Sequence, residues 1–81
     1  MDKDQMTKKL EEVILEVLPN IENINMTSSM VDVFGVNSIS LINIIVVAEA
    51  KFDIKFTDYE LALSAYDTFG DLLTTIEEKL A

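Results

Sequence analysis

The stretch Gly35-Val36-Asn37-Ser38-Ile39, with the apolar run from Ser40 to Phe52 behind it, sets the architecture of this chain. Glycine allows the chain to turn, and Asn37 and Ser38 are both good helix N-cap residues. Apolar side chains then recur at spacings of three and four, the period of an α-helix. The stripe consists of Leu41, Ile44, Ile45, Ala48 and Phe52. The pattern predicts a helix that buries one face and holds the Ser38 hydroxyl at its positively polarised end.

The same run is rich in β-branched residues, a composition that favours a buried strand. The run is long for a strand, and its polar residues fall at helical positions, so a helix is the better prediction. Ile39, Ile42 and Val46 form a second apolar stripe, offset from the first. Two alternatives stay open for this second stripe: it packs under the preceding loop, or it is exposed and marks a docking face beside Ser38.

Before this run, a helical stripe extends from Asp4 to Leu18, and Pro19 stops it. The connection from Asn20 to Asn37 is long for a compact domain, yet apolar residues are set into it. They predict that the connection packs across the helices. These residues are Ile21, Ile24, Met26, Met30, Val31, Val33 and Phe34.

After the central run, Asp53 to Phe56 is expected to be extended. Capping boxes at Thr57-Asp58-Tyr59-Glu60 and Thr68-Phe69-Gly70-Asp71 predict a short third helix, reaching Leu63, and a last helix. The predicted stripe of that last helix is Phe69, Leu72, Leu73, Ile76 and Leu80. The fold class is therefore all-α: one domain, residues 1–81, forming a small three-to-four-helix bundle with a long loop between helices one and two.

The composition argues against catalysis by the chain itself. It contains no cysteine and no histidine, which removes thiolate nucleophiles, thiolate metal sites and the usual general base. The carboxylates look scattered, because neighbours such as Glu11 and Glu12 do not face each other on a helix. No catalytic residue and no metal ligand is predicted.

Net charge and hydropathy limit the classes of partner that we expect for this chain. Fifteen acids against six lysines give a net charge of −9, which repels nucleic acid. No segment reaches the roughly 20 apolar residues of a membrane span, and the polar N-terminus does not resemble a secretory signal. We therefore expect a cytoplasmic monomer without nucleic-acid partners.

The arrangement resembles an acyl carrier protein, a small acidic helical bundle whose second helix begins at a Gly-x-Asp-Ser-Leu motif. Here the motif stands as Gly35-Val36-Asn37-Ser38-Ile39, and the similarity continues through Phe52-Asp53-Ile54-Lys55-Phe56 and Thr68-Phe69-Gly70-Asp71-Leu72-Leu73. The resemblance implies that Ser38 carries 4'-phosphopantetheine, with Asn37 and Gly35, which precede it in the motif, as the other residues of the cofactor site. A phosphopantetheinyl transferase using Mg²⁺ would transfer this group from coenzyme A.

The resemblance also implies a function. Acyl groups would travel as thioesters on the arm and reach acyl-transfer, ligase or ketosynthase enzymes of fatty-acid, polyketide or related biosynthesis. Candidate docking residues are Ile39, Ile42, Asn43, Val46 and Glu49. If the acyl chain is sheltered between helices two and three, the candidate lining residues are Ile45, Phe52, Phe56, Leu61 and Leu63. The alternative, in which these residues are plain core, stays open.

The chain departs from the family pattern in ways that indicate a specialised member. Asn37 replaces the usual Asp before the serine, and Ile39 replaces the usual Leu. Asn43, Ala50 and Lys51 stand where fatty-acid carriers have acids. Partners should therefore depend on apolar contact more than on charge. A polyketide, hybrid-peptide or modified-lipid pathway is expected rather than housekeeping fatty-acid synthesis.

Other functions stay open at the level of sequence. A peptidyl or aminoacyl carrier and a D-alanyl carrier for cell-wall polymers have the same composition, since the loading enzyme chooses the cargo. The competing class is a non-enzymatic helical interaction module, in which Ser38 is only an N-cap and the stripe of Ile39, Ile42 and Val46 is the docking site.

Overall fold

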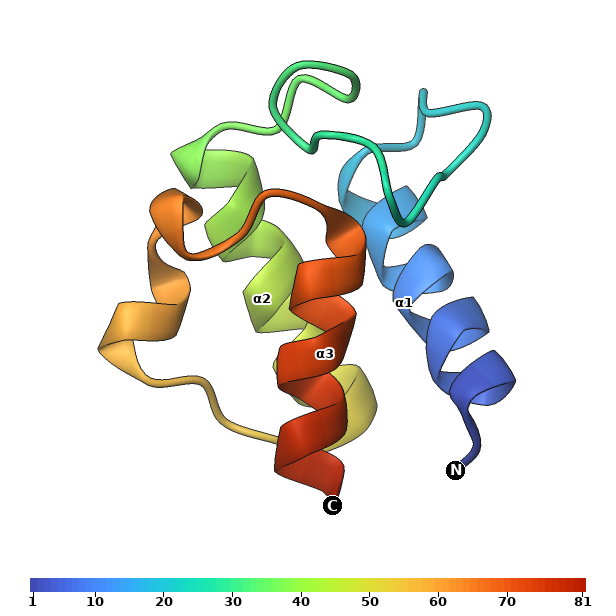
Figure 1. Ribbon diagram of the computed structural model, residues 1–81, viewed down its shortest axis with the longest axis vertical. Coiled ribbons are helices and arrows are strands. Elements are labelled where there is room, and N and C mark those ends of the chain that lie inside the picture. The colour runs from blue at the N-terminus through green and yellow to red at the C-terminus, as the bar shows by residue number, and fades with distance from the viewer.

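The computed structural model describes all 81 residues as one helical bundle. Its elements are α1 (Lys3–Val17), α2 (Ser38–Phe52), two 3₁₀ turns, η1 (Asp58–Leu61) and η2 (Leu63–Ala65), and α3 (Phe69–Leu80). Figure 1 shows the long first loop crossing one end of the bundle, with both termini at the opposite end. The all-α prediction is confirmed.

The central run forms a helix, as its periodicity predicts. All five members of the stripe from Leu41 to Phe52 are buried, and α2 packs mainly against α1. The helix ends at Asp53, which has a left-handed backbone (φ 55°) and donates its N–H to Glu49 O. A short polar side chain tolerates this conformation better than most, so Asp53 turns the chain out of the helix.

The flanking helices complete the core with their predicted faces. The sixteen buried side chains include no charged residue. α1 ends at Val17, just before Pro19, as predicted. Leu80 departs from prediction, because the last turn of α3 reaches past the core and leaves this residue 39% exposed. Buried residues of the outer helices are Met6, Leu10, Val13, Ile14, Phe69, Leu72, Leu73 and Ile76.

The long loop packs down through one deeply buried residue. Met30 has no exposed surface, its N–H donates to Asp67 O (2.9 Å), and its carbonyl accepts from Val36 N–H (3.0 Å). The Phe34 ring packs against the Phe69 ring, with centroids 5.2 Å apart and the ring planes tilted by 34°. The loop therefore packs across the helices, as expected. Two members of its apolar set do not: Val31 and Val33 are 47% and 61% exposed.

A close backbone approach fastens the same loop to the start of α3. Gly70 N–H donates to Met26 O at 2.9 Å, and a Cβ on Gly70 would lie 2.7 Å from that oxygen. Thr68 caps the helix, and the Asp71 carboxylate accepts the N–H groups of Asp67 and Thr68. Those two backbone donors hold the pKa of Asp71 below its usual value.

The predicted short third helix is not one continuous helix. The segment forms two 3₁₀ turns instead, because Ala62 adopts an extended backbone (φ −82°, ψ 134°) between them. The Glu60 carboxylate still accepts the Thr57 N–H (2.7 Å), so the predicted capping partner is present. No helix is both long and apolar enough to cross a membrane.

Candidate functional site

The turn into α2 depends on a glycine. Gly35 has φ +68°, a left-handed conformation that costs glycine little, and its N–H donates to Val31 O (3.1 Å). The next side chain, Val36, is 2% exposed and sits in the core. Gly35 thus bends the chain, and Val36 fixes where the helix begins.

Asn37 is the N-cap of α2. Its Oδ1 accepts the N–H of Ser40 (2.9 Å), and Ser40 Oγ accepts the N–H of Asn37 (2.9 Å), which completes a capping box. Sequence reasoning missed Ser40, although its position three residues after the cap was a usable signal. Ser38 is the first helical residue, so the alternative in which Ser38 is the N-cap is wrong.

The capping hydrogen bonds join Asn37 to Ser40 and do not involve Ser38. It is exposed, and its hydroxyl has no hydrogen-bond partner in the protein. The N–H groups of Ser38 and Ile39 likewise donate to no protein acceptor, and the first turn of α2 has no acidic residue. Unpaired N–H groups at a helix N-terminus favour an anion. A phosphodiester on Ser38 Oγ fits this environment.

The second apolar stripe is exposed beside that serine. Ile39, Ile42 and Val46 are 74%, 44% and 57% exposed, so the alternative in which they pack under the loop is wrong. Asn43 is also exposed. Glu49 differs from the others: it is half-buried, and its Oε2 accepts the N–H of Phe56 (2.9 Å). This docking candidate therefore also holds the chain that follows α2.

The residues suggested for an acyl pocket belong to the core or lean on it. Ile45 and Phe52 are buried, and Phe56, Leu61 and Leu63 are half-buried against the core. None of the four hollows in the surface is lined by any of the five. Shelter for an acyl chain there stays a prediction.

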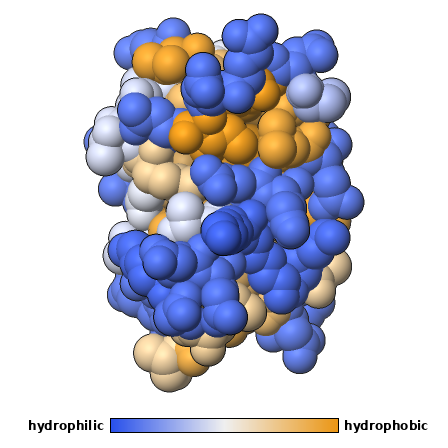
Figure 2. Space-filling model, turned by 90° about the vertical axis from the view of Figure 1, so that its right-hand side faces the viewer, coloured by the Kyte–Doolittle hydropathy of each residue, from blue (hydrophilic) through white to orange (hydrophobic).

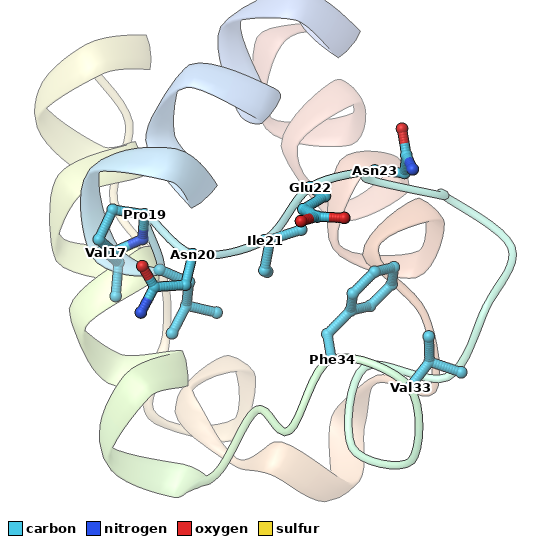
Figure 3. A pocket seen from close by; sticks show the side chains of 9 residues that line it. Val17, Pro19, Asn20, Ile21, Glu22, Asn23, Val33 and Phe34 are labelled. Carbon is cyan, nitrogen blue, oxygen red and sulfur yellow. The ribbon is translucent and has the colours of Figure 1, made fainter.

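The largest hollow lies at the loop end of the bundle and measures about 600 Å³. Its walls are the end of α1, the residues that follow it, and Val33 with Phe34. Figure 3 shows Phe34 reaching toward the segment that carries Ile21 and Glu22. Figure 2, which views the molecule from the right-hand side of Figure 1, shows an apolar patch toward the loop end and mostly hydrophilic side chains below it.

No cluster of three or more acidic, histidine or cysteine side chains is arranged to hold a metal ion. The site consists of the Ser38 hydroxyl at the start of α2, beside backbone N–H groups that can donate to an anion. On a small helical bundle, these are the features expected of a carrier domain, the class of protein in which a serine bears a prosthetic group.

The comparison with protein families also indicates a carrier domain. The family model described as "Phosphopantetheine attachment site" matches residues 8–76, which include most of α1, all of α2 and most of α3. The chain therefore belongs to this family of phosphopantetheine-carrying domains, to which acyl carrier proteins belong. Their prosthetic group is covalent 4'-phosphopantetheine, which supplies a reactive thiol that this chain lacks.

Replacing the cap residue tests the geometry of the site. Asn37→Ala removes the acceptor for the Ser40 N–H, so we expect a loss of about 1 kcal/mol in the free energy of unfolding. Asn37→Asp keeps the acceptor and adds a negative charge at the helix start, worth a further ~0.3–1 kcal/mol.

The carboxyl group that Asn37→Asp introduces should have a lowered pKa in the folded state, because the helix start favours its charged form. The extra stability should therefore be present above the unfolded pKa of about 3.9 and disappear as the pH falls through the folded value. Urea unfolding at two pH values measures both effects. Equal stability of wild type and Asn37→Ala would contradict the capping role.

Proposed function

We propose that this chain carries acyl intermediates as thioesters on a 4'-phosphopantetheine arm at Ser38 and delivers them to enzymes of fatty-acid, polyketide or related biosynthesis. The observation that carries the proposal is the exposed Ser38 hydroxyl, free of hydrogen bonds, at the start of α2 in a chain of this family. The unpaired N–H groups of Ser38 and Ile39 support the same site. A peptidyl, aminoacyl or D-alanyl cargo is the alternative, because the loading enzyme selects it.

Partner enzymes supply the chemistry in this proposal. The two carboxylates whose pKa values are lowered, Glu60 and Asp71, are both engaged in hydrogen bonds within the fold. The arm's contribution is to raise the effective concentration of its cargo at whichever enzyme the carrier has docked on.

We propose that docking uses the exposed stripe of Ile39, Ile42 and Val46, with Asn43 and Glu49 at its edge. This surface begins one residue after Ser38 and is apolar. Only one acid, Glu49, lies within α2, and its carboxylate is already bonded to Phe56 N–H. The charge that α2 itself presents to a basic partner is correspondingly small, which favours a dedicated partner set and a specialised pathway.

Modification of the purified chain tests the function. Incubation with a broad-specificity phosphopantetheinyl transferase, Mg²⁺ and coenzyme A should add one phosphopantetheine to the intact mass. Peptide mapping should place it on Ser38 rather than on the other serines, Ser28, Ser29, Ser40 and Ser64. No mass gain with this enzyme and with a transferase dedicated to the pathway would overturn the proposal in favour of an interaction module.

Docking through the apolar stripe predicts a specific mutational effect. Val46→Lys places a charge in the middle of the stripe, and truncation of a central contact typically costs about 1–2 kcal/mol or more. We expect the KM of the transferase for this protein to rise about tenfold with little change in kcat.

The control is Leu15→Lys, which adds the same charge at a 42% exposed position on α1. A similar KM change in both variants would mean that net charge, rather than the stripe, governs docking. Raising the salt from about 0.05 to about 0.5 M screens the attraction that the net charge of −9 exerts on a basic partner, but most of the KM difference between Val46→Lys and wild type should remain, since apolar contacts are not screened.

A further inference from the structure

One asparagine of this chain is followed by a small residue. Asn37 precedes Ser38, whereas each of the other four asparagines precedes isoleucine or methionine; these four are Asn20, Asn23, Asn25 and Asn43. In any asparagine, the backbone nitrogen of the next residue can attack the carbon of the side-chain amide, which releases ammonia. A bulky side chain on that next residue crowds the nitrogen and hinders the attack. Asn37 is therefore the asparagine with the least hindered neighbour.

The nitrogen positioned to attack Asn37 is free of hydrogen bonds. The Ser38 N–H donates to no protein acceptor, and both residues are exposed. The nitrogen that follows Asn20 is engaged instead, because the Ile21 N–H donates to Leu18 O (3.3 Å). A backbone nitrogen attacks only after it loses its proton, and the positively polarised start of a helix favours the negative charge that this creates. The start of α2 therefore promotes attack by the Ser38 nitrogen.

The remaining asparagines lack this combination. Asn25 Oδ1 accepts both the N–H and the hydroxyl of Thr27, at 2.8 and 2.7 Å, and the next residue is methionine. Asn43 lies inside α2, where the helical backbone fixes the nitrogen that follows it. Asn23 is the nearest competitor, since the Ile24 N–H is also unpaired, but its neighbour is β-branched.

The capping box restrains attack at Asn37. This residue has an extended backbone (φ −116°, ψ −179°), and its Oδ1 accepts the Ser40 N–H at 2.9 Å. Its own N–H donates to Ser40 Oγ at 2.9 Å. A ring that joins the Ser38 nitrogen to the Asn37 side chain rotates Asn37 away from this conformation, so these bonds must break first. Helix ends open locally at low free-energy cost, and the rate then depends on how often the first turn of α2 opens.

We propose that Asn37 is a deamidation site, the fastest in this chain, and that the capping box sets its rate. The Ser38 nitrogen loses its proton to base and attacks Asn37 Cγ. The N–Cγ bond forms, the Cγ–Nδ2 bond breaks, and Nδ2 leaves as ammonia after it takes a proton from water. The product is a cyclic imide.

Water then opens this imide at one of its two carbonyl carbons. Opening at Cγ leaves aspartate, and opening at the backbone carbonyl leaves isoaspartate, in which the main chain runs through the former side chain. One water is consumed and one ammonia is released, so the reaction requires no oxidant and no second enzyme.

Incubation of the full chain, without its prosthetic group, at mildly alkaline pH tests the site. We expect the intact mass to rise by the difference between a carboxyl and an amide group. Peptide mapping should place this gain at Asn37 ahead of the other asparagines, and a methyltransferase specific for isoaspartate should methylate the same peptide. No gain at Asn37, or an equal gain at Asn23, would overturn the proposal.

Two replacements of Ser38 form a matched pair, because neither retains the hydroxyl. Ser38→Val places a branched β-carbon beside the attacking nitrogen, so we expect the gain at Asn37 to slow about tenfold. Ser38→Ala leaves the nitrogen unhindered and should react within about twofold of the wild-type rate. Equal rates in Ser38→Val and wild type would show that the Ser38 nitrogen is not the nucleophile.

Ser40→Ala tests the restraint by the capping box. It removes the acceptor of the Asn37 N–H, so the first turn of α2 should open more often and deamidation of Asn37 should accelerate about fivefold. Ser64→Ala, which removes an exposed hydroxyl outside α2, should leave the rate unchanged. An unchanged or slower rate in Ser40→Ala would contradict the role of the capping box.

The two products should differ in their effect on the start of α2, a consequence that rests on the proposed function. Aspartate keeps an acceptor for the Ser40 N–H, whereas isoaspartate lengthens the main chain directly before Ser38. We expect a phosphopantetheinyl transferase to modify the aspartate form of aged protein and to leave the isoaspartate form unmodified. Equal modification of both forms would overturn this consequence. Failure to modify fresh protein would instead count against the proposed function, while the mapping of deamidation stands independently of it.

Discussion

Ser38→Ala is expected to abolish phosphopantetheinylation, leaving the intact mass unchanged under conditions that convert the wild type completely. The reason is chemical: under the proposed function the hydroxyl oxygen would become the ester oxygen of the attached group, and alanine has no such oxygen. The fold should survive the change. The hydroxyl makes no hydrogen bond, Asn37 rather than Ser38 caps the helix, and alanine favours helix, so we expect the free energy of unfolding to stay within about 0.5 kcal/mol.

Ser40→Ala is the matched control. It removes the neighbouring hydroxyl, which does have a structural role as acceptor of the Asn37 N–H, and should cost about 1 kcal/mol of stability. The variant should nevertheless gain one phosphopantetheine. Modification of Ser38→Ala, or loss of modification in Ser40→Ala with the fold intact, would contradict the assignment of the attachment site.

Met30→Ala is expected to have the largest effect on stability. The side chain is completely buried in the long loop, and its removal leaves a cavity between that loop and the helices. Such truncations cost about 2–5 kcal/mol. A domain of this length has roughly 4–12 kcal/mol of total stability, so the variant should be close to unfolding at about 37 °C.

Urea unfolding followed by circular dichroism measures this loss against two controls. Met30→Leu roughly conserves volume and should cost less than about 1.5 kcal/mol. Val31→Ala truncates the next residue, which is 47% exposed, and should stay within about 0.5 kcal/mol. Equal effects of Met30→Ala and Val31→Ala would contradict the role of Met30 as the anchor of the loop.

The features that sequence predicted correctly all depend on local patterns. The spacing of Leu41, Ile44 and Ile45 defined the buried face of α2, because helical period and burial are linked wherever one side of a helix faces a core. Pro19 and Thr68 each affect the chain within one helical turn: α1 ends just before Pro19, and Thr68 caps the start of α3. The assignment of Ser38 as the attachment site also rests on its immediate neighbours in the chain, and it stays a prediction until the modification experiment is done.

The remaining features depend on contacts between residues far apart in the chain, which no local pattern encodes. Gly70 is required because the backbone of Met26 comes close to it, and Met30 is buried because the chain beside Asp67 lies against it. Val31 and Val33 are exposed although their neighbours pack, since these contacts decide which side of the loop faces the core. Periodicity and capping residues in the sequence thus predict the helices of the bundle. The packing of its loops depends on backbone contacts that form only in the tertiary structure.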